Sequence, residues 1–130
     1  GARGPAMVGD IAASVERLRA QLKQVRYPQP LDVQGLYAGR PSALLPLLHY
    51  ALLDFSSALC IFLSDSGHEL RTKSDLRFLE GVYRAVREHM GYSPGLTVAQ
   101  FLATGFAERK ILLCVDVVRL AVAKSAELSA

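Results

Sequence analysis

Apolar residues recur every three or four positions over residues 11–25, which is the period of a helix that buries one side. Asp10 precedes this stripe as a candidate N-cap, and Pro28 cannot continue a helix, so we predict a helix that ends near Tyr27. The apolar positions of the stripe are Ile11, Val15, Leu18, Leu22 and Val25.

The same period returns after Ser74, a second candidate N-cap, and continues until Gly91. It predicts a long amphipathic helix whose apolar positions are Leu76, Leu79, Tyr83, Val86 and Met90, with Phe78 and Val82 beside them. The polar residues 68–73, HELRTK, come just before Ser74 and are expected to form a loop.

Two segments are apolar on almost every side and are expected to be buried. One, LLPLLHYALLDF, follows Ser42, and we place its Pro46 in the first turn of a helix, where a missing N–H costs little. The other runs from about Ala107 to Glu127, buries Cys114, and is the best candidate for a central, enclosed helix.

Shorter helices are predicted over residues 32–39 and 57–63, and a capping box of Thr97 and Gln100 predicts another that ends at Gly105. No segment alternates apolar and polar residues over five positions, as a half-buried strand would. The fold class is therefore all-α, with six to seven helices of unequal length around a central apolar C-terminal helix.

Length and composition are those of one domain. The chain has 130 residues, 51% of them hydrophobic, which excludes intrinsic disorder for most of it. We interpret residues 1–6, GARGPA before a methionine, as a cloning remnant, and residues 7–130 as a single domain. The longest apolar stretch, residues 111–122, contains Asp116 and Arg119 and is too short for a membrane helix, so we expect no transmembrane span.

Net charge and cysteine content bear on the class of partner and on the redox environment of the protein. The net charge is +3, or +2 once Arg3 is set aside, which is far below that of an obligate nucleic-acid binder. Cys60 and Cys114 lie in apolar segments without a CxxC spacing. This placement favours two reduced core cysteines in a cytosolic protein over a disulfide.

Residue patterns typical of catalysis are missing. His49, His68 and His89 stand far apart in the sequence, without a Cys, Asp or Glu at metal-site spacing, so we predict no metal site. No glycine-rich phosphate motif and no nucleophile elbow occurs. Glu80 and Glu88 have arginines three or four residues away, which indicates surface pairing. The sequence predicts no catalytic residue and no cofactor, and hence a protein that is not an enzyme.

The charged residues of the helix after Ser74 form the most informative surface. Arg77, Arg84 and Arg87 follow at spacings of seven and three and share its outer face, and Lys73 lies just before it. Glu80 dilutes this cationic stripe. Two interpretations remain open: a solvated face of mixed charge, or a surface for an acidic partner.

The order of segments resembles that of a known family. The first helix closes in VRYP, and LDVQGLYAGRPSALLPLLHY, KSDLRFLEGVYRAVREHMGYSP, LTVAQFLATGFAERK and a final apolar helix follow. This string is similar to the N-terminal domain of the centrosomal proteins of 44 kDa, a divergent branch of the calponin-homology superfamily, over residues 7–130. One departure is Arg109, which stands where we expect an aromatic residue.

The resemblance implies a calponin-homology-like fold and a place at the centrosome, centriole and spindle pole, in the cytoplasmic cytoskeleton. It implies binding to microtubules or tubulin, and no enzymatic activity. It also implies that a coiled coil follows the domain in full-length relatives. We therefore expect a monomeric domain in a chain that dimerises through that coiled coil.

Our leading hypothesis is a tubulin-binding module, because microtubules expose acidic surfaces. The basic face would consist of Lys73, Arg77, Arg84 and Arg87, joined by Lys23 or Lys110. The alternative is an adaptor that docks onto a centriolar scaffold protein through an apolar groove. An exposed patch with Tyr37, Tyr92 or Phe106 would favour the adaptor. Nucleic-acid and membrane partners are not expected.

Overall fold

The computed structural model describes residues 10–72 and 74–130, and within them the regular structure is entirely helical. The α-helices are α1 Ile11–Gln24, α2 Val33–Ala38, α3 Pro41–His49, α4 Ser57–Asp65, α5 Asp75–Met90, α6 Val98–Leu102 and α7 Ala107–Ser129, and a π-helical turn, η2 Tyr50–Asp54, extends α3. The predicted all-α class with six to seven helices is confirmed. The predicted cloning remnant, residues 1–6, lies outside the described residues.

Helix ends follow the local signals in the sequence. The Ser74 side chain accepts a hydrogen bond from the backbone N–H of Arg77 at 3.0 Å, and Thr97 and Gln100 form both bonds of the capping box. Helix α5 ends at Gly91, whose φ of 61° is in the left-handed region that favours glycine. Asp10 occupies the N-cap position of α1, but its side chain makes no capping bond.

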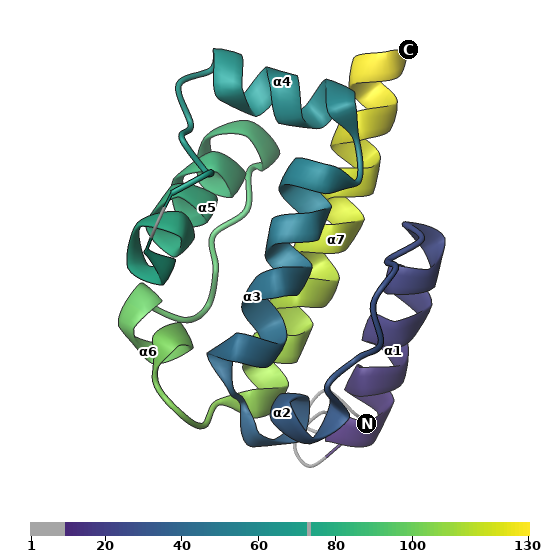
Figure 1. The fold of residues 1–130 in the computed structure, drawn as a ribbon, viewed down its shortest axis with the longest axis vertical. Coiled ribbons are helices and arrows are strands. Elements are labelled where there is room, and N and C mark those ends of the chain that lie inside the picture. Colours follow the sequence, from purple (N-terminus) through teal and green to yellow (C-terminus); the bar gives the residue numbers. More distant parts are fainter. Residues whose placement is uncertain (1–9, 73) are drawn as a thin grey trace.

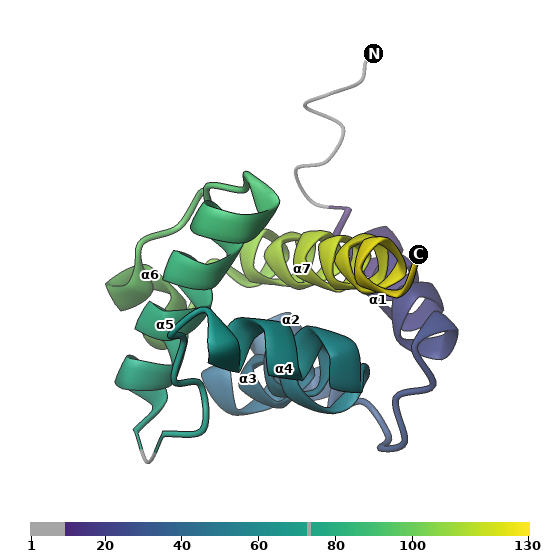
Figure 2. The same ribbon diagram turned by 90° about the horizontal axis from the view of Figure 1, so that it is seen from above.

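Helix α7 forms the centre of the molecule, as its pattern predicts. It contacts α1, α2, α3, α4 and α5. In Figure 1, α1, α3 and α7 rise side by side from the same end, while α4 lies across the far end of α3 next to α7. Figure 2 shows α5 and α1 on opposite sides of α7. Any surface formed by α5 is therefore remote from one formed by α1.

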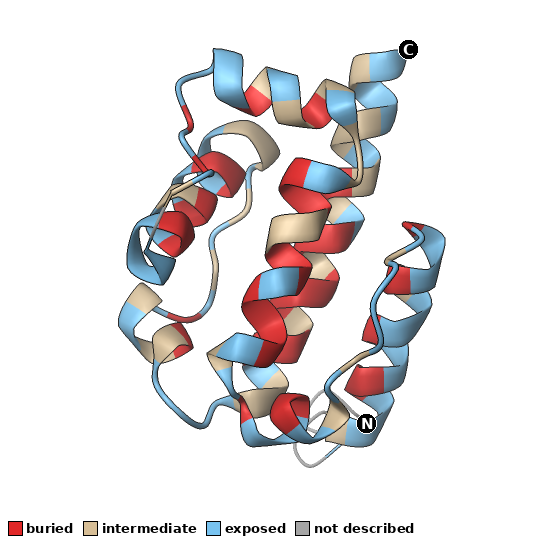
Figure 3. Cartoon of the chain, in the orientation of Figure 1, coloured by how far each residue is buried: buried red, intermediate tan, exposed pale blue. Residues whose placement is uncertain are grey.

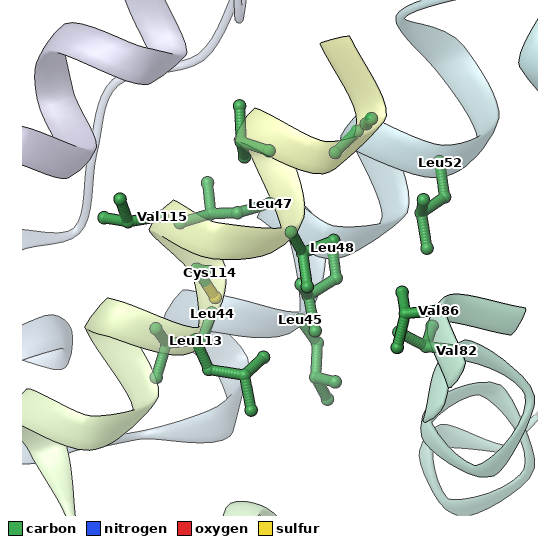
Figure 4. Close-up of a cluster of buried hydrophobic side chains, with 14 of the residues drawn as sticks. Leu44, Leu45, Leu47, Leu48, Leu52, Val82, Val86, Leu113, Cys114 and Val115 are labelled. Carbon is green, nitrogen blue, oxygen red and sulfur yellow. The ribbon is translucent and has the colours of Figure 1, made fainter. Parts of the chain in front are cut away.

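The core surrounds α7, where the apolar faces of α1, α3, α4 and α5 meet it. Buried positions gather on the inward sides of these helices (Figure 3). Leu45 and Leu48 lie between Cys114 of α7 and the α5 valines Val82 and Val86 (Figure 4). Cys114 is fully buried and Cys60 half-buried, and both are free thiols.

Two details of the sequence prediction are wrong. Helix α3 begins at Pro41, one residue before Ser42, so Pro46 lies inside the helix and has no N–H for the carbonyl of Ser42. Leu76, placed in the apolar stripe of α5, is 49% exposed. It belongs to the first turn of that helix, and the packed stripe begins only at Phe78 and Leu79.

Among the described residues, no single helix is long and apolar enough to cross a bilayer. In the same part of the chain, the segments Pro41–Asp54 and Ser57–Asp65 together reach that length and composition, but across a bend of 88°.

Candidate functional site

The outer face of α5 carries the predicted arginines. Arg77, Arg84 and Arg87 are all exposed, because the opposite side of this amphipathic helix packs on the core through Leu79, Val82 and Val86. Lys73, the fourth predicted residue of this face, lies outside the described residues. The three arginines define what we call the α5 basic face.

Acidic residues lie on this face between the arginines. Glu80 and Glu88 are also exposed on α5. Within residues 10–72 and 74–130, however, none of the three arginines forms an ion pair with a carboxylate. Their guanidinium groups thus remain available to an external acidic group.

The α5 basic face borders a hollow of about 310 Å³ between α5 and the loop that follows α4. Arg77 and Arg84 line it together with Glu69 and Glu80, and His68, Gly81 and Thr72 complete most of the wall. A carboxylate entering this hollow would meet two guanidinium groups beside two carboxylates, so the hollow itself has mixed charge.

Lys23 and Lys110 do not extend this face. Lys23 is exposed on α1, which lies on the other side of α7 (Figure 2). Lys110 is fully buried, so the prediction that it contributes to an exposed basic surface is wrong.

The Lys110 ammonium group is instead part of the interior. It donates hydrogen bonds to the carbonyl of Gly39, at 2.7 Å, and to that of Ala103. It also lies 5.8 Å from the centroid of the Phe101 ring. Burial lowers the pKa of this lysine from its ordinary value. Gly39 approaches Gly105 so closely that a Cβ atom would lie 2.4 Å from the Gly105 oxygen, so Lys110 ties together a tightly packed corner.

A second candidate surface is a groove of about 530 Å³ between the α1–α2 connection, α3 and the start of α5. His49 stacks on Phe78 along it, with ring centroids 4.7 Å apart, and Tyr27 meets Tyr50 edge-on at 5.2 Å. Asp54 and Asp75 add acidic groups to the lining. The π-helical turn η2 forms part of this wall, and such turns are frequent at functional sites.

The aromatic residues expected to mark an adaptor surface behave differently from one another. Tyr37 and Phe106 are each 44% exposed. Tyr92 is half-buried and donates a hydrogen bond to Asp116 at 2.8 Å, and burial together with this bond raises its pKa. Tyr92 is therefore a structural residue.

Two histidines lie together although the sequence separates them. The Nε2 atoms of His68 and His89 are 2.8 Å apart, although the two residues are 21 positions apart in the sequence. No spacing signal reveals the pair, because His68 follows α4 while His89 ends α5.

Comparison with known proteins assigns the chain to a family. Residues 10–130 match the family model described as "Centrosomal spindle body, CEP44". The chain is 40% identical over 121 residues to the centrosomal protein of 44 kDa of Xenopus tropicalis, 39% to that of Bos taurus and 37% to that of Homo sapiens. These alignments cover 93% of this chain and 31% of each relative, so the chain spans about a third of the length of these curated relatives.

Proposed function

Since the chain belongs to the centrosomal spindle body family of CEP44 proteins, we propose that it is the tubulin-binding module of a centrosome-associated protein. The module acts by binding and catalyses no reaction. Its binding surface is the α5 basic face, and its ligand is the acidic surface of tubulin or its acidic tails. The kinship to calponin-homology domains, expected from the sequence, stays a prediction.

The observation that supports this function is the set of exposed α5 arginines that form no ion pair with a carboxylate in the described part of the chain. Arg77, Arg84 and Arg87 offer three guanidinium groups on one helix face, two of them at the hollow beside it. Their attraction to a carboxylate extends over about 8 Å at physiological salt. Glu80 and Glu88 moderate this attraction, so we expect micromolar affinity, raised by avidity in a dimeric full-length protein.

The test is co-sedimentation of the chain with taxol-stabilised microtubules. Reversing Arg77, Arg84 and Arg87 together to Glu should weaken binding at least tenfold, or about 1.4 kcal/mol. The fold should survive, since exposed substitutions change stability by about 0.5 kcal/mol or less each. Binding of the unmodified chain should also weaken as salt rises and after the acidic tubulin tails are removed.

Lys23→Glu is the matched control for this experiment. It reverses an exposed lysine on α1, remote from α5, and should leave microtubule binding within about twofold of the unmodified value. If the triple reversal and high salt leave the pelleted fraction unchanged, the α5 basic face is not the tubulin site.

The groove between α3 and the start of α5 supports a second candidate function, an adaptor that docks onto a centriolar scaffold protein. Ser42 is exposed and lines this groove, so Ser42→Arg should fill part of it without disturbing the core. For an adaptor, this variant should lose recruitment to centrioles in cells while it still pellets with microtubules. Normal recruitment would exclude the groove as the docking site.

A further inference from the structure

A cluster of three metal-ligating side chains lies where the ends of α4 and α5 meet. The Nε2 atom of His68 is 2.8 Å from Nε2 of His89 and 3.4 Å from Oε1 of Glu88. One ligand atom from each of these residues lies within 4.8 Å of the other two. His68 also lines the hollow beside Arg77 and Arg84, so the cluster adjoins the α5 basic face but consists of different side chains.

The backbone holds His68 in place. After α4 ends, the N–H of His68 bonds to the carbonyl of Leu63 and the N–H of Gly67 to that of Ser64, each at 3.0 Å. These two bonds, with Gly67 at a φ of 90°, form the Schellman motif that fixes the direction of the chain leaving a helix. His68 therefore enters the contact with α5 from a rigid turn.

The other two ligands come from the last turn of α5. Glu88 and His89 precede the glycine cap of this helix at Gly91. The cluster thus lies beside the last turn of α5 and just after the end of α4, and helix carboxyl ends favour positive charge. The location is electrostatically suited to a cation.

Burial limits which nitrogen of the His68 ring can form a hydrogen bond. Its side chain is 2% exposed, and its Nδ1 atom has no hydrogen-bond partner. All polar contacts of the ring are therefore made through Nε2, which faces His89 and Glu88.

We propose that His68, His89 and Glu88 bind one zinc ion, with water in the fourth position. Two imidazole nitrogens and one carboxylate oxygen form a donor set that zinc accepts in tetrahedral geometry. Zinc–nitrogen bonds of about 2.0–2.1 Å place two ligand nitrogens about 3.3 Å apart, so the two rings need to separate by only about half an ångström.

Charges and neighbours around the site are compatible with this assignment. The Phe62 ring meets His89 edge-on at 4.9 Å and restricts its orientation. Arg84, the nearby cation, opposes a metal ion, while Glu88 offsets it. A bound ion would cross-link the loop after α4 to the end of α5 and should raise the stability of the domain.

The test is titration of the chain, prepared without a histidine tag, with zinc chloride at neutral pH. Calorimetry should show one zinc ion per chain, and the melting temperature should rise with zinc concentration. Cobalt(II) in its place should give the intense visible absorption of a tetrahedral site. The absence of both zinc binding and this absorption at micromolar metal would overturn the proposal.

Variants locate the site. His89→Ala should weaken zinc binding at least a hundredfold, and Glu88→Gln about tenfold. His49→Ala is the matched control, because His49 stacks on Phe78 in the groove, and it should bind zinc normally. If His49→Ala weakens binding as much as His89→Ala does, the ion is bound elsewhere. Should His89→Ala fail to fold, the cobalt spectrum of the unmodified chain and Glu88→Gln still decide the question.

Discussion

At the scale of single residues, Lys110 shows how position overrides residue type. A lysine in the first turn of a helix normally extends its ammonium group into solvent. Here its ammonium group meets two backbone carbonyls, one at the end of α2 and one before α7. Both carbonyls lie in turns, outside the regular hydrogen bonding of a helix. The ammonium group of Lys110 supplies the donors that a helix would otherwise provide.

Replacing Lys110 with Met tests this role. The variant keeps much of the side-chain volume but leaves the carbonyls of Gly39 and Ala103 without their donor. We expect the free energy of unfolding to fall by about 2 kcal/mol, since a buried unsatisfied group such as the Gly39 carbonyl costs about 1–3 kcal/mol, whereas the carbonyl of the exposed Ala103 can bond to water. Urea denaturation measures the change. Lys23→Met, on the surface, should shift stability by about 0.5 kcal/mol or less.

At the scale of helices, capping interactions explain most of the observed ends. Ser56, Ser74 and Thr97 each accept a hydrogen bond from a backbone N–H in the first turn of their helix. These bonds depend on residues three positions apart, so the sequence alone reveals them. The exceptions are α1 and α7, whose N-cap residues make no side-chain bond, and α3, where Pro46 lies inside the helix and a π-helical turn follows.

The capping bonds predict that substitutions at the starts of α6 and α1 differ in their effect on stability. Thr97→Ala removes both a capping side chain and its part of the capping box, and should lower stability by about 1 kcal/mol. Asp10→Ala removes a residue that makes no side-chain capping bond and should change stability by about 0.5 kcal/mol or less. Thermal unfolding of the two variants compares them directly. Equal losses would show that the hydrogen bond at Thr97 contributes nothing of its own.

At the scale of the whole molecule, α7 determines the arrangement. Five other helices contact it, so its apolar positions need cover on several sides at once. This central helix keeps α1 and α5 apart (Figure 2), which separates the α5 basic face from Lys23 on α1, whereas the groove beside α3 reaches the start of α5.

Val115→Asp tests the central role of α7. Val115 is only 3% exposed, and an unpaired carboxylate there costs several kcal/mol against a total stability of about 5–15 kcal/mol. We expect the whole domain to unfold, which far-ultraviolet circular dichroism would reveal. Ala123→Asp, at an exposed position of the same helix, should remain folded. A normal melting curve for Val115→Asp would contradict the central placement of α7.

The sequence by itself determined the all-α class, most helix boundaries, the burial of Cys114 and the exposure of Arg77, Arg84 and Arg87. Periodicity and capping act over three or four residues, so they are present in the chain before it folds. Only the tertiary structure decided that Lys110 is buried, that Lys23 is remote from α5, and that the groove exists.

The contact between His68 and His89 was also decided only by the tertiary structure, because it joins the loop after α4 to the last turn of α5. Which helices become neighbours depends on how many apolar faces pack together at once. No short stretch of sequence contains that information.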